Sequence, residues 1–206
     1  MGESGVGKSM FLKRIADDDF SNDFSPTIGI DFKNLVVDLD DEDEDEDEDD
    51  SDGDGIKVQL WDLPGKEEYR TIATSYFDGT HGVLLVYDVT GRYSFDSIRN
   101  WIRLIDDKIG THVSKILVGH KCDQVDNQVV STEEGRRLAR EFNIQFYECS
   151  SQANENLQAA VEGLVKSIQE RREEERVVES EQVGPGFFQK IAIGWSSWRS
   201  STSSMA

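Results

Sequence analysis

Apolar residues recur along this chain at two periods, which divide it into candidate strands and helices. Alternation at every second position predicts a strand over residues 28–39 and a hairpin partner over residues 56–61. On the first strand, Phe32, Leu35 and Val37 are the candidates for the buried face. Short continuous apolar runs, typical of parallel strands covered on both faces, occupy residues 83–87 and 115–119. Helical spacing predicts helices over residues 8–17, 95–109, 132–142 and 155–172.

The order of these elements, in which strands alternate with helices, predicts an α/β fold with a doubly wound, mostly parallel sheet flanked by helices. One domain is expected over residues 1–172. Beyond it charged residues dominate, and Gly184-Pro185-Gly186 would interrupt any helix. Residues 173–206 are therefore expected to form a separate, variable tail.

The net charge of −20 comes from 42 acidic and 22 basic residues among 206, and the imbalance is local. Residues 38–54 contain fourteen acidic residues and no basic one, so removing them from −20 leaves −6. Nucleic acid is not expected as a partner, because binding it requires clustered Lys and Arg. Cys122 and Cys149 have no metal-ligand spacing, and a disulfide is not expected. No run approaches the ~18 apolar residues of a membrane span, and a signal peptide is not expected.

Residues 2–9 read Gly-Glu-Ser-Gly-Val-Gly-Lys-Ser, which fits the phosphate-binding spacing Gly-x-x-x-x-Gly-Lys-Ser. Its small residues allow successive backbone N–H groups to surround phosphate oxygens. Lys8 is placed to reach the β- and γ-phosphates, and Ser9 to ligate Mg²⁺. Such a loop normally follows a buried strand, for which no residues precede Gly2. We therefore expect Met1 to be an internal methionine of a longer protein, and residues 1–206 alone to fold poorly.

Three later motifs narrow the nucleotide to a guanine nucleotide. After the hairpin, Asp62 can hold the Mg²⁺ hydration shell, and the Gly65 N–H can meet a γ-phosphate. In His120-Lys121-Cys122-Asp123, the Asp123 carboxylate can accept hydrogen bonds from guanine N1–H and N2–H₂, which adenine does not offer. The Lys121 stem can stack on the base. Ser150-Ser151-Gln152 follows the last short strand, where a backbone N–H can contact guanine O6.

Taken together, residues 2–172 resemble a Rab-type small GTPase of the Ras superfamily. The segment Ser25-Pro26-Thr27-Ile28-Gly29-Ile30-Asp31-Phe32 resembles the Rab switch I region, and Ser94-Phe95-Asp96-Ser97-Ile98-Arg99-Asn100-Trp101-Ile102 looks most like secretory-pathway Rabs. The resemblance implies a six-stranded, mostly parallel sheet with five helices, whose central first strand is absent here.

The resemblance also implies a bound cofactor, GTP or GDP with Mg²⁺, and the residues that hold it. Ser9 and Thr27 would ligate the metal, Asp62 would hold it through water, and Phe20 would pack on the guanine edge. An effector surface would consist of Phe32, Trp61 and Tyr76, although Trp61 is equally well interpreted as a core residue. The implied nucleotide-binding residues are Gly2, Glu3, Ser4, Gly5, Val6, Gly7, Lys8, Ser9, Met10, Phe20, Thr27, Gly65, His120, Lys121, Asp123, Ser150, Ser151 and Gln152.

Four positions depart from the Rab pattern. Lys66 replaces the catalytic Gln, and its ammonium group cannot accept a hydrogen bond from the attacking water. Catalysis would then rest on Lys66, Gly65 and Lys8, and slow intrinsic hydrolysis of GTP is expected. A GTPase-activating protein that supplies its own Arg and Gln would restore fast hydrolysis. Pro64 replaces Ala and stiffens the adjoining loop.

The other two departures concern the base. His120 replaces an Asn that ties the base-binding loop to the phosphate loop and contacts the guanine. One lost hydrogen bond is worth about 1 kcal/mol, so nucleotide affinity is expected to be several-fold weaker. Gln152 replaces a Lys, a smaller loss because the backbone does most of that work.

The acidic run, residues 40–55, lies where the family has a tight turn. Its like charges repel one another, so a disordered insert is expected. Asp50, Asp52 and Asp54 imitate the start of a calcium loop, but the twelfth position is Trp61 rather than Glu, and no EF-hand is expected. The insert is either a solvated excursion or a binding site for basic partners or weakly bound Ca²⁺.

The tail has no CaaX, Cys-Cys or Cys-x-Cys ending, so prenylation is not expected for this chain. Aromatic and aliphatic residues from Phe187 to Trp198 would suit either an interfacial membrane anchor or a disordered end.

The leading hypothesis is a Rab-like GTP-binding switch in vesicle and membrane trafficking. It would be cytoplasmic, in part peripheral on endomembranes, with an exchange factor, a GTPase-activating protein and effectors as partners. The alternative is a degenerate nucleotide-binding scaffold with negligible turnover that acts through its acidic insert. A P-loop kinase for small molecules is disfavoured, because Asp123 and the switch motifs would have no role in it.

Overall fold

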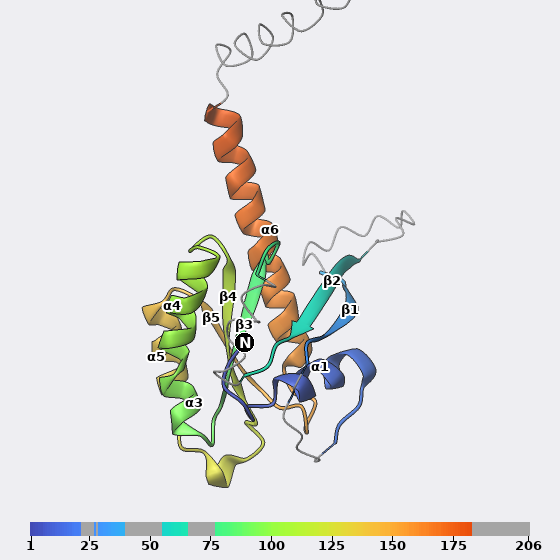
Figure 1. Ribbon diagram of the computed structural model, residues 1–206, viewed down its shortest axis with the longest axis vertical. Coiled ribbons are helices and arrows are strands. Elements are labelled where there is room, and N and C mark those ends of the chain that lie inside the picture. Colours follow the sequence, from blue (N-terminus) through green and yellow to red (C-terminus); the bar gives the residue numbers. More distant parts are fainter. Residues whose placement is uncertain (22–26, 28, 40–54, 66–76, 183–206) are drawn as a thin grey trace, which may run out of the picture. The chain divides into compact units, whose positions relative to one another are not determined.

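The structure is a computed structural model that describes residues 1–21, 27, 29–39, 55–65 and 77–182, and the side chains of these residues up to 177. The chain divides into two units, residues 1–168 and 169–206. The elements are α1 (Lys8–Asp17), β1 (Asp31–Val37), β2 (Ile56–Asp62), β3 (Gly82–Asp88), α3 (Arg92–Asp96), α4 (Ile98–Lys108), β4 (Ser114–His120), the 3₁₀ turn η2 (Val125–Asn127), α5 (Thr132–Glu141), β5 (Gln145–Cys149) and α6 (Leu157–Gln182) (Figure 1).

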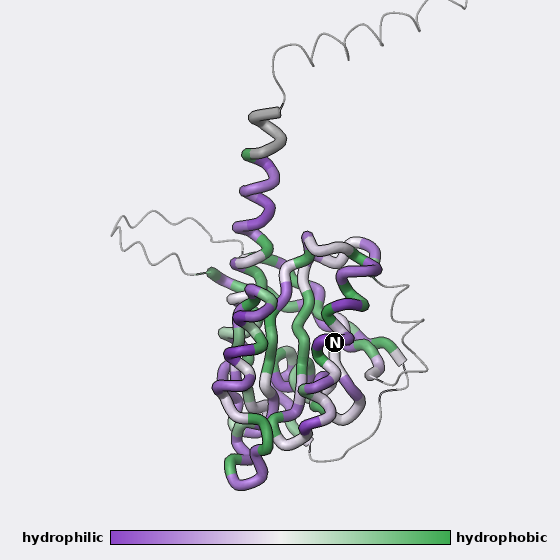
Figure 2. Tube along the Cα trace, turned by 90° about the vertical axis from the view of Figure 1, so that its left-hand side faces the viewer, coloured by the Kyte–Doolittle hydropathy of each residue, from purple (hydrophilic) through white to green (hydrophobic). Residues whose placement is uncertain are grey.

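A parallel sheet in the order β3-β4-β5 forms the centre of the first unit. Alternate side chains of a strand point to opposite faces of the sheet, and here both faces are covered. Leu85 and Leu117 pack with residues of α3, α4 and α5, while Val86 and Val118 pack with residues of α1 and α6. The two continuously apolar runs in the sequence are thus the buried parallel strands, and Figure 2 shows these apolar segments in the interior of the domain. This confirms the expected α/β fold.

Strands β1 and β2 form a separate antiparallel hairpin, with Leu35 opposite Val58 and Phe32 opposite Trp61. Val37 is 1% exposed and faces the core, but Phe32 is 44% exposed. The prediction that Phe32 shares the buried face with Leu35 and Val37 is therefore wrong. Phe32 is an odd number of residues from both of them, and period-2 alternation turns its side chain to the other face.

The hairpin and the three-stranded sheet are not hydrogen-bonded to each other in the residues that the structure describes. At the edge of β3, the backbone of Met1 takes the position of a neighbouring strand. Its amino group donates to the Leu84 carbonyl, and the Val86 N–H donates to the Met1 carbonyl at 2.7 Å. The described residues thus form two separate sheets, of two and three strands, instead of the single six-stranded sheet implied by the resemblance.

Two helices differ from their predicted bounds. The helix predicted over 95–109 is two helices, α3 and α4, that meet at Ser97. Helix α3 starts earlier, at Arg92, where the Ser94 N–H donates to the Gly91 carbonyl at 3.0 Å and the Ser94 hydroxyl donates to the same oxygen at 2.7 Å. Helix α6 ends at Gln182 rather than near residue 172. The Glu, Gln and Arg residues that follow position 168 have high helix propensity, and residues 169–183 contain no Gly or Pro.

Helix α5 begins with a capping box that holds the segment after η2. The Ser131 hydroxyl accepts a hydrogen bond from the Glu134 N–H at 3.3 Å, and the Glu134 carboxylate accepts one from the Ser131 N–H at 2.9 Å. We expect Ser131→Ala to lower the free energy of unfolding by about 1 kcal/mol, because an amide at the helix start loses its partner. Urea denaturation measures this, and Ser131→Thr, which keeps the hydroxyl, should lose markedly less.

Candidate functional site

The predicted site residues meet at one edge of the parallel sheet. Asp88 and His120 end β3 and β4, and Ser150 directly follows β5. In an α/β sheet, ligands bind outside the carboxyl ends of the strands, which is where these residues lie. The phosphate loop, residues 2–9, runs past the same edge and leads directly into α1. Residues from four distant parts of the sequence are thereby brought together.

The phosphate loop ends at the N-terminus of α1, where the helix dipole favours an anion. Gly7 has φ of 98°, a left-handed conformation that a residue with a side chain rarely adopts. The Lys8 ammonium donates to the carbonyls of Gly2 and Glu3, at 3.0 and 2.8 Å. Burial lowers the pKa of Lys8 to about 8, and the nearby carboxylates of Asp62 and Glu3 act in the opposite direction. A buried ammonium inside this loop is suited to pair with phosphate oxygens.

Three oxygen donors from separate segments converge next to Lys8. The Ser9 and Thr27 hydroxyl oxygens are 2.7 Å apart, and the Ser9 hydroxyl also donates to the Asp62 carboxylate. The second carboxylate oxygen of Asp62, Oδ1, is buried and has no hydrogen-bond partner in the described residues. Hydroxyl and carboxylate oxygens are the ligands that Mg²⁺ prefers, so these residues fit a magnesium ion together with phosphate oxygens and water. The described residues contain no cluster of three or more His, Cys, Asp and Glu side chains that could hold a metal.

Gly65 lies against the phosphate loop so closely that a side chain would not fit. A Cβ atom at this position would be 2.5 Å from the Ser4 nitrogen and 2.5 Å from the Glu3 carbonyl carbon. The backbone of the segment after β2 can therefore approach the phosphate loop directly. Lys66, the next residue, lies outside the described residues, as does Tyr76.

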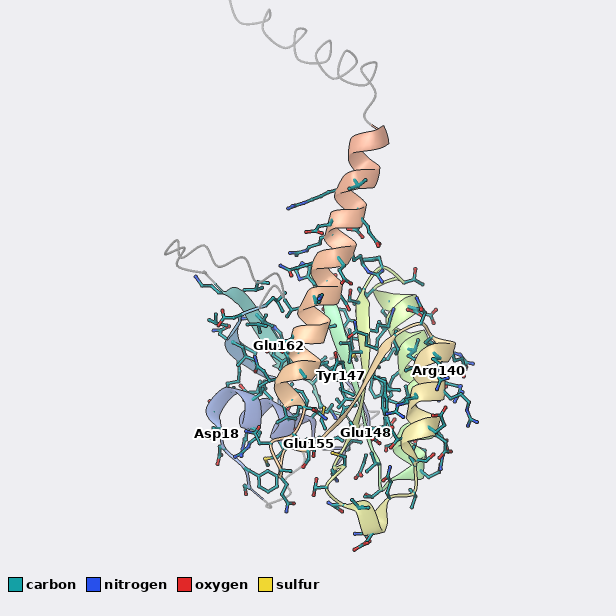
Figure 3. The ribbon with its side chains drawn as sticks, turned by 180° about the vertical axis from the view of Figure 1, so that it is seen from behind. Asp18, Arg140, Tyr147, Glu148, Glu155 and Glu162 are labelled. Atoms are coloured by element: carbon teal, nitrogen blue, oxygen red, sulfur yellow. The ribbon has the colours of Figure 1, made fainter. Side chains whose placement is uncertain are left out.

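The predicted base-recognition residues are held together by their own hydrogen bonds. The Asp123 carboxylate accepts from the Ser150 hydroxyl at 2.5 Å, and the Ser150 oxygen accepts from the Ala153 N–H at 2.9 Å. Ser150 and Ser151 are fully buried, whereas Gln152 is exposed. One Asp123 oxygen is thus fixed by Ser150, which orients the carboxylate. Figure 3 shows the back of this region, where β5 carries Tyr147 and Glu148 and precedes Glu155.

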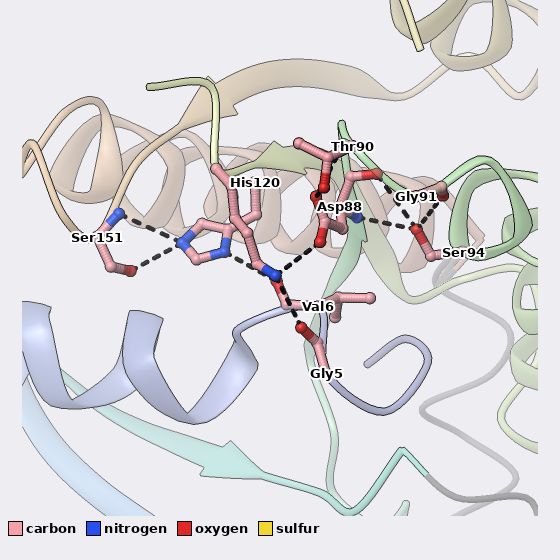
Figure 4. Close-up of polar contacts among 9 residues, drawn as sticks. Gly5, Val6, Asp88, Thr90, Gly91, Ser94, His120 and Ser151 are labelled. Atoms are coloured by element: carbon pink, nitrogen blue, oxygen red, sulfur yellow. Dashed lines mark hydrogen bonds and ion pairs between the residues drawn. The ribbon is translucent and has the colours of Figure 1, made fainter. Parts of the chain in front are cut away.

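Two residues of the motif at 120–123 tie it to the phosphate loop. His120 Nδ1 is 2.8 Å from the Val6 carbonyl oxygen, and the Lys121 ammonium donates to the Gly5 carbonyl at 3.0 Å (Figure 4). Lys121 also forms an ion pair with Asp88 at 2.6 Å. Burial lowers the pKa of His120, with the positive charge of Lys121 acting in the same direction. His120 and Lys121 therefore connect the base motif to the phosphate loop.

Two residues near the site were not predicted from the sequence. Asp88 accepts hydrogen bonds from the Thr90 hydroxyl at 2.7 Å and the Thr90 N–H at 2.8 Å, which orients its carboxylate for Lys121. On α4, the Trp101 indole N–H donates to the Glu3 carboxylate at 3.0 Å. Asp88 could have been predicted from its position at the carboxyl end of a parallel strand, where ligands bind. Nothing local in the sequence indicates that Glu3 contacts Trp101.

The remaining predicted residues are placed as follows. Phe32 and Trp61 stack with ring centroids 4.9 Å apart and are 44% and 42% exposed, so Trp61 is not a core residue. Met10 Sδ lies 3.5 Å from the Ser21 nitrogen, and Phe20 is half-buried. The acidic insert, apart from Gly55, and residues 183–206 of the tail lie outside the described residues. None of the described helices has the length and apolar character of a membrane-spanning segment.

A parallel α/β sheet whose carboxyl edge carries this phosphate loop, an Asp-containing base motif and a hydroxyl-carboxylate cluster defines a Ras-type G domain. Comparison with known sequences agrees: residues 1–170 match the Ras family. The chain is 44% identical over 171 residues to Ras-related protein Rab-8B of Dictyostelium discoideum, covering 83% of this chain and 78% of that one. It is 43% identical over 168 residues to Ras-related protein Rab-8A of Bos taurus, covering 82% and 75%, and 43% identical over 172 residues to Ras-related protein RABE1e of Arabidopsis thaliana, covering 83% and 73%. The chain therefore belongs to the Ras family, as a small GTPase of the Rab type.

Proposed function

We propose that this protein is a GTP-binding switch that acts in vesicle and membrane trafficking and hydrolyses GTP slowly on its own. The observation that carries the proposal is the convergence of Lys8, Ser9, Thr27 and Asp62, together with an Asp123 carboxylate that Ser150 orients. These groups offer one cation for phosphate, oxygen ligands for Mg²⁺ and one carboxylate for the guanine edge. Trafficking is supported by the relation to Rab proteins rather than by the site.

Each residue has a role in this mechanism. Lys8 and the loop N–H groups would bind the β- and γ-phosphates, and Ser9 and Thr27 would hold Mg²⁺, which neutralises charge on the phosphates when bound. Asp62 would orient the metal's water. Thr27 belongs to the switch I segment and Gly65 to the segment after β2, so both would respond to the presence of a γ-phosphate.

The intrinsic rate of GTP hydrolysis is expected to be low. Hydrolysis needs a group that positions the attacking water, and the family's Gln is replaced by Lys66. The partner proteins that we expect are therefore an exchange factor, effectors at the Phe32–Trp61 surface, and a GTPase-activating protein that contributes catalytic groups. The cytoplasmic face of endomembranes is the expected location.

Nucleotide selectivity tests the proposal. With Mg²⁺ present, GTP and GDP should displace a fluorescent GDP analogue at much lower concentrations than ATP does, because adenine lacks the N1–H and N2–H₂ donors that Asp123 accepts. Displacement by ATP at the same concentration as GTP would contradict the assignment of Asp123. A loaded protein should release phosphate slowly in a single turnover.

The replacement of the catalytic Gln by Lys66 also favours a second function, that of a nucleotide-binding scaffold with negligible turnover that acts through the acidic insert. The two functions differ in multiple-turnover phosphate release with a Rab GTPase-activating protein. Sustained release supports the switch, and binding without stimulated release supports the scaffold.

A further inference from the structure

The imidazole of His120 lies between the phosphate loop and the loop after β5. His120 is 3% exposed at the end of β4. Its Nδ1 is 2.8 Å from the Val6 carbonyl oxygen, and its Nε2 is 2.8 Å from the Ser151 hydroxyl and 3.3 Å from the Ser151 backbone nitrogen. Figure 4 shows the ring spanning the two loops. Both ring nitrogens are thus used by the protein, and neither remains for the base.

The chemistry of these partners determines where the proton of the ring lies. A carbonyl oxygen only accepts hydrogen bonds, so Nδ1 must carry the proton that is donated to Val6. A backbone N–H only donates, so Nε2 must be the unprotonated nitrogen that accepts from Ser151. A single neutral tautomer therefore satisfies both loops at once.

Close packing restricts reorientation of the His120 imidazole ring. A Cβ atom on Gly7 would lie 2.3 Å from Nδ1, so the ring packs directly on the backbone of the phosphate loop. On α1, the Phe11 ring meets it edge-on, with centroids 6.3 Å apart. If the ring gained a proton, the phosphate loop or the loop after β5 would therefore have to move, because the ring itself cannot reorient.

We propose that His120 is a positioning residue of the nucleotide site, which joins the phosphate loop to the base-binding loop only while its ring is neutral. A second proton would lie on Nε2 and point at the Ser151 N–H, so that two donors would face each other. The Ser151 hydroxyl can turn to accept, but its backbone N–H cannot. Acidification would separate the two loops and speed the release of nucleotide. This inference rests on the proposed function, since it requires a guanine nucleotide at the site.

Three charged groups surround the ring, and their effects partly cancel. The positive charge of Lys121 opposes protonation of His120, while the carboxylates of Asp88 and Asp123 favour it. Burial is the largest influence, and the pKa of His120 lies below its ordinary value of 6.5. The unfolded chain therefore takes up a proton at a higher pH than the folded chain. Stability contributed by neutral His120 is complete above about pH 6.5 and decreases as the pH falls toward the lowered pKa.

The dissociation rate of a fluorescent GDP analogue from the Mg²⁺-loaded protein tests the proposal. Between about pH 7.5 and about pH 5.5 the rate of the natural chain should rise about fivefold or more, as expected for the loss of at least one good hydrogen bond. His120→Asn should show a rate nearly independent of pH over this range, because its amide donates to Val6 and accepts from Ser151 without a titrating proton. His112→Asn, which changes an exposed histidine, should keep the rise of the natural chain.

Several outcomes would overturn the inference. Equal acceleration in His120→Asn would assign the pH dependence to another group. A rate in the natural chain that stays flat down to a pH at which nitrogen NMR shows the ring protonated would show that protonation does not loosen the site. Nitrogen NMR of the natural chain gives a result that does not depend on any variant: a proton on Nε2 rather than Nδ1 at neutral pH would contradict the tautomer. Failure of every variant to bind the GDP analogue at neutral pH would instead contradict the proposed function itself.

Discussion

Replacing Asp123 by Asn is expected to weaken GDP and GTP binding by about 10²–10³-fold, through the loss of charge-assisted hydrogen bonds worth roughly 1.5–3 kcal/mol each. The carboxylate offers two acceptors to guanine N1–H and N2–H₂. An amide keeps one acceptor and presents an N–H₂ group to another donor. Displacement of a fluorescent GDP analogue measures the change in affinity.

The same variant should gain affinity for xanthine nucleotides, in which an oxygen replaces the guanine amino group and can accept from the new amide. This gain separates a role in base recognition from general damage, because Asp123 also accepts from Ser150 and its replacement disturbs that contact. Asp126→Asn, an equal change of charge on the exposed turn η2, should leave both affinities unchanged. Equal losses for guanine and xanthine nucleotides would assign Asp123 a structural role only.

The second large effect, on the intrinsic rate of GTP hydrolysis, is expected when Lys66 is replaced. Lys66→Gln should raise the intrinsic rate of GTP hydrolysis on the order of 10–100-fold, because a Gln carbonyl accepts a hydrogen bond from the attacking water and its amide can contact the reacting groups. A lysine ammonium provides donors only. Phosphate release from GTP-loaded protein in a single turnover measures the rate.

The control for this prediction is Lys66→Ala, which removes the ammonium group without adding an acceptor. Its rate should stay within about threefold of the natural chain if the missing Gln is the cause. Should Lys66→Ala gain as much as Lys66→Gln, the ammonium would itself be inhibitory. No gain in either variant, with GTP bound normally, would show that the step limiting hydrolysis lies elsewhere.

The described residues show which expectations depended on local sequence and which did not. The elements over 8–17, 56–61, 83–87, 115–119 and 132–142 agree with the structure to within one or two residues, because hydrophobic periodicity is a local property. The expectation for Phe32 is wrong because it places Phe32, Leu35 and Val37 on one face, whereas strict alternation separates Phe32 from the other two. Helix α6 is longer than predicted because the charged residues beyond position 172 favour helix.

The sequence by itself was enough to recognise the spacing of the phosphate loop and to propose the guanine motif, since each is a short run whose chemistry depends on fixed spacing. Only the tertiary structure decided how these motifs are connected. The contact of His120 with Val6 spans 114 positions, that of Lys121 with Gly5 spans 116, and that of Trp101 with Glu3 spans 98. Such contacts follow from the order of strands in the sheet, which brings the carboxyl ends of β3, β4 and β5 to one edge, and no local pattern specifies them. The neutral tautomer of His120 is fixed in the same way, by partners on two loops that meet only in the folded protein.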